Sequence, residues 1–213
     1  MTPTAARASN ALLVALIAAA FVAAWVLRDS GLLSLSPPAS PANPAPAPDA
    51  VGRELALYLS AFTAWAALLL LMPAYVFVWF SQSSARARDW WVSFWSVAFA
   101  AYAIHLLVSM FLFFGGDFNW MTQSSRVSAF WPGMIIALWW PFDLWLARTQ
   151  ADEVLWVRVE RIMLHVVIFV LFVGGSAVMG ELPAAKIIGL ALFALGAVSF
   201  AQWAKRRYLE GKG

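Results

Sequence analysis

Residues 90–114, WWVSFWSVAFAAYAIHLLVSMFLFF, contain no charged residue and a single histidine, His105. A helix of this length rises about 38 Å, and the hydrocarbon core of a bilayer is about 30 Å thick. An unpaired backbone group costs several kcal/mol in hydrocarbon, and a helix pairs these groups within the segment where an open strand does not. The stretch therefore predicts a membrane-spanning helix.

Five further stretches have the length and composition of membrane spans. The six predicted spans are Ala11–Leu27, Leu55–Phe80, Trp90–Phe114, Val127–Ala147, Ile162–Gly180 and Pro183–Ala204. Apolar residues make up 63% of the 213 residues and charged residues 12%, against roughly 45–50% and about 25% in an average soluble domain. We therefore predict an all-α polytopic membrane protein, a bundle of six transmembrane helices in a lipid bilayer.

The residue types exclude several functions. The chain has no cysteine, hence no disulfide, thiolate metal site or iron–sulfur cluster. Thirteen tryptophans suit the aromatic belts of a membrane protein. The net charge of +3 forms no basic stripe with interleaved aromatic residues, so nucleic-acid binding is not expected. There is no glycine-rich phosphate loop, nucleophile triad or HExxH motif, and we expect no independent catalytic activity.

The prolines divide the chain into three parts. Residues 35–50, LSPPASPANPAPAPDA, hold six of the eleven prolines, which predicts an extended solvated spacer or a docking strap for a partner. We expect a first transmembrane helix at 1–27, a Pro/Ala-rich extracytoplasmic linker at 28–53, and a five-helix membrane core with a basic C-terminal tail at 54–213.

The first predicted helix has an alternative interpretation as a signal peptide. Its 17-residue apolar run is longer than a usual signal core, and no small-x-small cleavage site precedes Arg28. We therefore expect a retained helix, which packs through the small residues Ala15, Ala19 and Ala23.

Positive charges predict the orientation. With both termini in the cytoplasm, the inner side carries ten Lys and Arg residues: Arg7, Arg86, Arg88, Arg148, Arg158, Arg161, Lys205, Arg206, Arg207 and Lys212. The outer side carries four: Arg28, Arg53, Arg126 and Lys186. This positive-inside bias predicts a multi-pass protein of a bacterial-type inner (plasma) membrane, with both termini inside.

Three ionisable residues lie at membrane depth, where such groups are costly and commonly functional. His105 lies about 4.5 Å outward from the middle of its span, at 1.5 Å per residue. Asp143 and His165 each lie about 9 Å inward from the middle of theirs. The two histidines therefore differ in depth by about 13 Å, which disfavours one haem ligated by both.

Asp143 and His165 are expected at one level, near the inner face. Arg158, Arg161 and His165 follow a helical spacing that places them on one face. We predict a buried polar cluster of Asp143, Arg158, Arg161 and His165. It is either a functional site or an ion-paired knot that orients two helices.

A second set of candidates surrounds His105. Trp91, Trp95, Tyr102, His105 and Ser109 share one face of their span. An aromatic face with a histidine and hydroxyl groups is suited to a flat ligand such as haem b, a quinone or a chlorin. The alternative is core packing, in which a hydroxyl group binds the imidazole.

The layout resembles the six-helix ferric-reductase-like membrane haem domains. The matching stretches are AFAAYAIHLLVSM with His105, LWVRVERIMLH with His165, and the basic ending AQWAKRRYL. The resemblance implies a haem-binding six-helix bundle in which His105 and His165 are haem-iron ligands.

One feature of that family is missing. Its members bind haem through histidines stacked on one helix, about 13 or 14 residues or close to four turns apart. The partner of His165 would fall at Val178 or Met179, and the partner of His105 at Trp91 or Val92, none of which is histidine. Met179 is a candidate sixth ligand for a haem held by His105.

The leading hypothesis for function is a membrane subunit of a redox or electron-transfer assembly. It would hold or pack against a flat cofactor near His105, with other membrane-protein subunits as partners. The alternatives are a cofactor-free scaffold or assembly protein, and a proton-coupled transporter that uses Asp143 and His165.

Overall fold

The computed structural model describes residues 2–28, 30, 35, 50–81, 83–123, 130–149, 154–178 and 182–210. Its elements are α1 (Pro3–Leu27), α2 (Ala50–Val78), α3 (Ala85–Leu107), η1 (Val108–Phe113), α4 (Phe118–Gln123), α5 (Phe130–Thr149), α6 (Leu155–Val173), η3 (Gly174–Val178) and α7 (Pro183–Glu210). The two π-helical segments η1 and η3 directly follow α3 and α6. The described residues contain no strand, which confirms the all-α class. Most of the predicted linker lies outside them.

Five helices are long and apolar enough to cross a membrane. They cover Pro3–Leu27, Glu54–Val78, Ala85–Phe113, Leu155–Val178 and Pro183–Arg206. These helices make the chain a candidate multi-pass membrane protein, and their apolar surfaces are compatible with lipid contact.

The predicted fourth span corresponds to α5, which is not among the five. Its 20 residues extend about 30 Å, so its length matches a bilayer core. Its composition differs from that of the other long helices because it contains four tryptophans and two prolines. Indole and proline lower its mean hydropathy, although the indole ring is large and mostly apolar.

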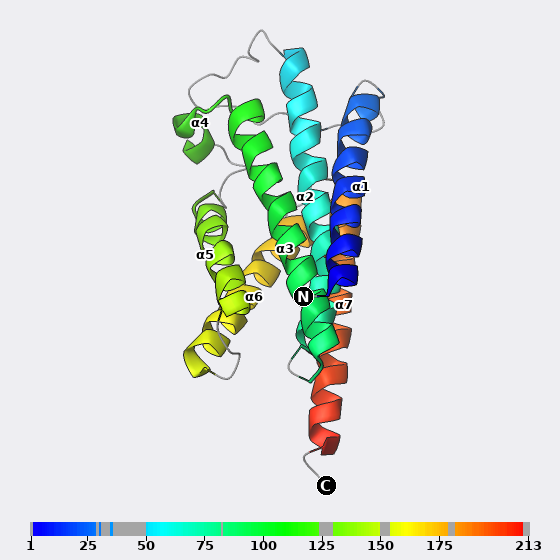
Figure 1. The fold of residues 1–213 in the computed structure, drawn as a ribbon. Coiled ribbons are helices and arrows are strands. Elements are labelled where there is room, and N and C mark those ends of the chain that lie inside the picture. Colours follow the sequence, from blue (N-terminus) through cyan, green and yellow to red (C-terminus); the bar gives the residue numbers. More distant parts are fainter. Residues whose placement is uncertain are drawn as a thin grey trace.

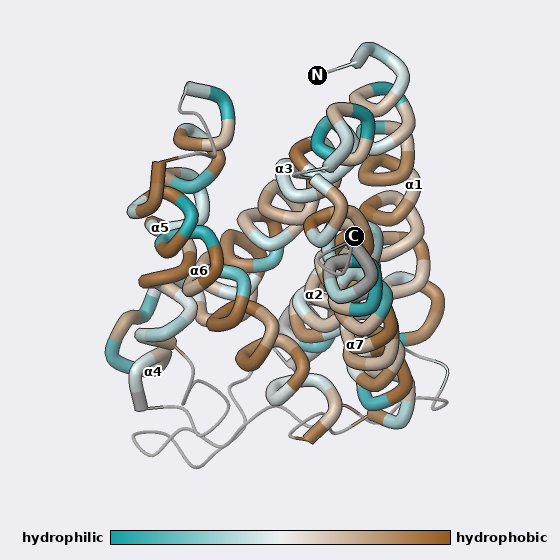
Figure 2. The backbone as a smooth tube through the Cα atoms, turned by 90° about the horizontal axis from the view of Figure 1, so that it is seen from below, coloured by the Kyte–Doolittle hydropathy of each residue, from teal (hydrophilic) through white to brown (hydrophobic). Residues whose placement is uncertain are grey.

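α2 lies at the centre of the bundle. It packs against α1, α3 and α7, while α5 contacts α3 and α6, and α6 reaches from α5 to α7 (Figure 1). The core between these helices contains three fully buried tryptophans, Trp91, Trp95 and Trp140. Figure 2 shows that apolar residues continue onto the outer surfaces of the helices, as expected of a bundle in lipid.

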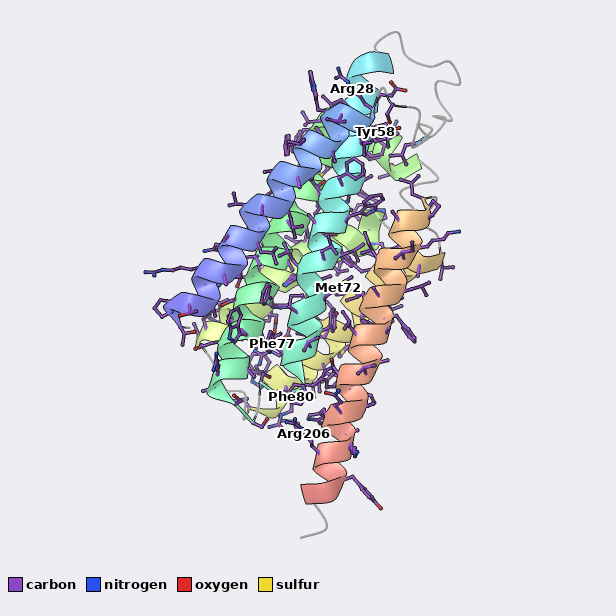
Figure 3. All side chains as sticks on the ribbon, turned by 90° about the vertical axis from the view of Figure 1, so that its right-hand side faces the viewer. Arg28, Tyr58, Met72, Phe77, Phe80 and Arg206 are labelled. Carbon is purple, nitrogen blue, oxygen red and sulfur yellow. The ribbon has the colours of Figure 1, made fainter. Side chains whose placement is uncertain are left out.

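The start of α1 and the end of α7 lie at the same end of the bundle, where α2 is followed by α3. The backbone N–H of Thr2 donates to Oδ2 of Asp89 at 2.9 Å. The guanidinium of Arg206 lies over the ring of Phe80, 5.0 Å from its centroid. Arg28 lies at the opposite end of the bundle (Figure 3).

The packing face of α1 is shifted by one residue from the predicted one, although the predicted Ala23 is partly buried and packs beside Ala20 and Ala24. Ala15 and Ala19 are exposed, whereas Ala20 and Ala24 are buried. One residue rotates a helix by about 100°. Larger neighbours of these alanines, among them Leu16, pack on the main core and turn Ala20 and Ala24 inward.

α6 begins earlier than predicted, at Leu155 and not near Ile162. The predicted span left out the charged stretch before Ile162. The described part of this stretch instead continues into the span, which places Arg158, Arg161 and His165 on one unbroken helix.

Candidate functional site

A buried ion pair joins α5 to α6. Asp143 is completely buried and Arg161 is 9% exposed. The Nε of Arg161 donates to Oδ1 of Asp143 at 3.0 Å. The indole Nε1 of Trp95, on α3, donates to Oδ2 of the same carboxylate at 2.7 Å. Both carboxylate oxygens therefore have donors, which a buried charge requires, and three helices meet at one side chain.

His165 is held through both ring nitrogens. The indole Nε1 of Trp91 donates to its Nε2 at 3.2 Å, and its Nδ1 lies 2.8 Å from the backbone carbonyl O of Arg161. Because indole can only donate and a carbonyl can only accept, Nδ1 carries the proton and the ring is neutral. The ring also stacks on Trp95, with centroids 4.0 Å apart and planes 9° apart.

Three further side chains lie around Asp143, Arg161 and His165, which we call the inner cluster, and none of the three was identified from the sequence. The Tyr75 hydroxyl, on α2, donates to the backbone carbonyl O of His165 at 2.7 Å. The indole Nε1 of Trp139 donates to Oε1 of Glu160 at 2.6 Å. Glu160 precedes Arg161 in the chain, so a second carboxylate lies beside the ion pair; its position at membrane depth in the longer α6 is the signal that could have found it.

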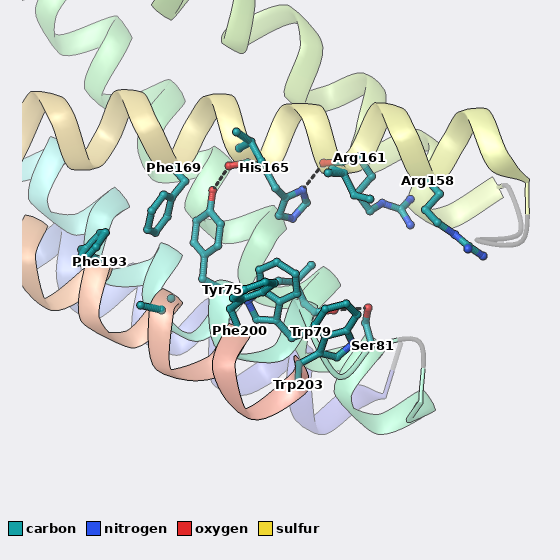
Figure 4. A pocket seen from close by; sticks show the side chains of 15 residues that line it. Tyr75, Trp79, Ser81, Arg158, Arg161, His165, Phe169, Phe193, Phe200 and Trp203 are labelled. Carbon is teal, nitrogen blue, oxygen red and sulfur yellow. Dashed lines mark hydrogen bonds between the residues drawn. The ribbon is translucent and has the colours of Figure 1, made fainter. Parts of the chain in front are cut away.

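The structure brings together three of the four predicted cluster residues. Asp143 and Arg161 are in direct contact, and His165 lies against Trp95, which binds the same carboxylate. Arg158 is exposed and lies at the edge of a cavity (Figure 4).

His105 occupies a different place, between α3 and α2. Its Nδ1 lies 2.8 Å from the backbone carbonyl O of Ser60. The carbonyl can only accept, so Nδ1 carries a proton, and in the neutral form of the ring Nε2 carries the lone pair. The Ser60 hydroxyl meets the Ser109 hydroxyl at 2.7 Å. In the core-packing alternative, the hydroxyl of Tyr102 or Ser109 binds the imidazole; in the structure, Nδ1 binds a backbone carbonyl instead.

Tyr102 turns toward α5. Its hydroxyl donates to the backbone carbonyl O of Gly133 at 2.9 Å. A Cβ at Gly133 would lie 3.0 Å from the hydroxyl oxygen of Tyr102, so the absence of a side chain at Gly133 lets Tyr102 approach α5 closely. The predicted face of Trp91, Trp95, Tyr102, His105 and Ser109 therefore contacts three neighbouring helices.

A series of ring contacts nevertheless connects the two histidines. From His105 it passes to Tyr102 (centroids 6.2 Å apart), Trp140 (5.9 Å), Trp95 (4.4 Å) and His165 (4.0 Å). These separations lie within or close to the usual range for interacting aromatic pairs. The bundle interior is thus a continuous aromatic layer from one imidazole to the other.

A cavity of about 360 Å³ lies between α2, α6 and α7. We call it the α6–α7 cavity. Aromatic side chains form much of its wall: Tyr75, Trp79, Phe169, Phe193, Phe200 and Trp203 (Figure 4). His165 and Arg161 line it beside the inner cluster, while His105 is not among its lining residues.

The described residues contain no group of three or more His, Asp or Glu side chains that could hold a metal ion. Met179, the candidate sixth haem ligand, lies outside the described residues. Within them, the side chain that offers a nitrogen lone pair for an iron ligand is His105.

Comparisons with family models, curated proteins and solved structures find no match for this chain.

Proposed function

We propose that the protein is an integral membrane subunit of an electron-transfer assembly that holds or packs against a flat cofactor at His105. The observation that carries the proposal is the orientation of this imidazole. Its Nδ1 donates to the carbonyl O of Ser60, which leaves Nε2 as the nitrogen with a lone pair. Metal-ligating histidines are commonly fixed in this way, with the second nitrogen donating to a carbonyl.

The surroundings of His105 support a flat partner. Tyr102 lies nearly parallel to the imidazole, at 30°, and the aromatic layer continues through Trp140 to Trp95. These rings are buried and already pack on one another, so a flat ligand would extend the layer at the imidazole by offset stacking. Haem b, a quinone and a chlorin all have this shape, and the metal of haem b or of a metallated chlorin would use the Nε2 lone pair.

The two histidines differ in what they offer to iron. Both nitrogens of His165 are engaged, by Trp91 and by the backbone carbonyl of Arg161. The donor set therefore fits one haem at His105 and no second haem at His165. Bound haem would supply one-electron chemistry; the protein's own residues would orient the axial imidazole through Ser60.

The proposal includes six spans in a bacterial-type inner membrane, with α5 as the sixth and both termini inside. The common position of the start of α1 and the end of α7 supports an even number of crossings. The ten Lys and Arg residues expected on that side agree with the positive-inside rule.

A second candidate, a cofactor-free scaffold, is favoured by the inner cluster. Every side-chain oxygen of Asp143 and every ring nitrogen of His165 has a partner within the protein. A closed network of this kind fixes helices relative to one another. The same engagement weakens the proton-coupled transporter, because Asp143 is already paired with Arg161.

The test is the absorption spectrum of the full chain, purified in mild detergent from its own membranes and extracted for quinones. We expect a Soret or chlorin band, or a stoichiometric quinone, that is lost in His105→Ala. Ser60→Ala is the matched control, because it keeps the backbone carbonyl that binds His105. A protein that carries no chromophore and no quinone, yet still co-purifies with partners in both variants, is a scaffold.

A further inference from the structure

The α6–α7 cavity is independent of His105 and has its own chemistry. Its wall is apolar along most of its length, from Phe193 and Phe169 to Phe200. Two polar side chains of its inner wall are already engaged: the Tyr75 hydroxyl binds the backbone of His165, and both ring nitrogens of His165 have partners. The buried indole Nε1 of Trp79, which also lines the cavity, has no hydrogen-bond partner among the described residues. The rest of the wall is mostly apolar, which suits a hydrocarbon chain.

One end of the cavity is cationic. Figure 4 shows Phe193 and Phe169 toward one end, and Ser81, Arg158 and Trp203 toward the other. Arg206 follows Trp203 by less than one turn of α7, and its guanidinium lies over Phe80, next to Ser81. Arg158 and Arg206 are exposed. Two tryptophans lie at this end, Trp79 and Trp203, with ring centroids 5.5 Å apart. Tryptophan is typical of the membrane–water interface.

An apolar cavity with cations and tryptophans at one end has the polarity of an acidic lipid. We propose that the α6–α7 cavity binds one acyl chain of an acidic phospholipid, whose phosphate lies at Arg158 and Arg206. The volume is within the usual range of about 300–1,000 Å³ for ligand pockets. Basic pockets between transmembrane helices bind lipid head groups on the same principle.

The contacts of α7 explain how the cavity forms beside α6. A Cβ at Gly196 would lie 2.8 Å from the ring of Phe169, so glycine lets α7 approach α6 at this level. Ala197, the next residue, is exposed and lines the cavity. A large side chain at Ala197 would occupy the space that we assign to the acyl chain.

The experiment is native mass spectrometry of the full chain, delipidated in detergent and titrated with phosphatidylglycerol. Phosphatidylcholine, inorganic phosphate and decylubiquinone are titrated in parallel. We expect one phosphatidylglycerol per chain, and weaker binding by about fivefold for each arginine removed in Arg158→Gln and Arg206→Gln. Ala197→Phe should abolish binding, while Ala194→Phe, at an exposed α7 position that does not line the cavity, should keep it.

Several results would overturn the proposal. Equal binding of phosphatidylcholine and phosphatidylglycerol would indicate lipid bound without recognition of its charge. Binding of inorganic phosphate alone would show that the acyl chain is not needed, and tighter binding of decylubiquinone would identify a quinone site. Unchanged phosphatidylglycerol binding by Ala197→Phe would place the lipid elsewhere. These readouts do not depend on any chromophore, so they succeed or fail separately from the proposal at His105.

Discussion

Asp143→Asn tests whether the buried ion pair holds α3, α5 and α6 together. The substitution keeps the size of the side chain and one carbonyl oxygen that Trp95 can still reach. It removes the negative charge 3.0 Å from Nε of Arg161. Arg161, which is 9% exposed, then loses the carboxylate that it binds directly and keeps the neighbouring Glu160 as a counter-charge, and breaking a buried pair in this way is costly.

The expected loss is about 3–5 kcal/mol in the free energy of unfolding, the usual effect of removing one partner of a buried pair. For a chain of this size, each kcal/mol lowers the melting temperature by roughly 2–4 °C. The variant should therefore melt roughly 6–20 °C below the wild type. In the assay, samples in detergent are heated to a series of temperatures. The folded protein that remains is then measured by size-exclusion chromatography with detection of the intrinsic tryptophan fluorescence.

Two variants complete this experiment. Asp117→Asn makes the same chemical change at an exposed position and should leave the melting temperature within about 1–2 °C of the wild type. Asp143→Leu combined with Arg161→Met removes both charges of the pair, and should be more stable than Asp143→Asn because neither member of the pair is left without the other. The reasoning is refuted if Asp143→Asn has the same melting temperature as Asp117→Asn, or if the double variant is the least stable of the three.

Three further comparisons probe the hydrogen bonds of the cluster, the contact of α7 with η3, and the turn after η1. Trp95→Phe removes a donor to a charged acceptor and should cost about 1.5–3 kcal/mol, more than Trp91→Phe at about 0.5–1.5 kcal/mol; equal melting temperatures would contradict this order. Gly189→Ala places a Cβ 2.7 Å from a backbone nitrogen of η3 and should cost about 1–3 kcal/mol, while Gly175→Ala, with nothing within 4 Å, should be tolerated in the same melting assay. Gly116→Ala forces a φ of 79° on an L residue, which should lower stability by roughly 1–2 kcal/mol; an unchanged unfolding midpoint would show that this turn relaxes.

The sequence predicts much of this architecture because membrane spans depend on length and composition, which can be read directly. Five of the predicted spans correspond to helices long and apolar enough to cross a membrane. α5 is the exception, because its four tryptophans and two prolines lower its mean hydropathy. The relative depth of Asp143 and His165 could also be estimated, because helical rise per residue is constant.

Rotation about the helix axes could not be predicted in the same way. The small residues of α1 form two possible faces one residue apart, and only the contacts of Leu16 and its neighbours select Ala20 and Ala24. Likewise, nothing in the sequence pairs Trp91 with His165 or Trp95 with Asp143. Those hydrogen bonds depend on which helices are neighbours, as does the cavity between α6 and α7.

The most direct test of the account uses the fact that the chain contains two histidines. Nitrogen-15 NMR of histidine-labelled protein, titrated with diamagnetic zinc protoporphyrin, reports which imidazole can ligate a metal in a flat macrocycle. We predict that both free rings are neutral with the proton on Nδ1, and that only the Nε2 signal of His105 shifts, as identified by its absence in His105→Ala. A shift of the His165 signal, or no shift of either, would contradict the account.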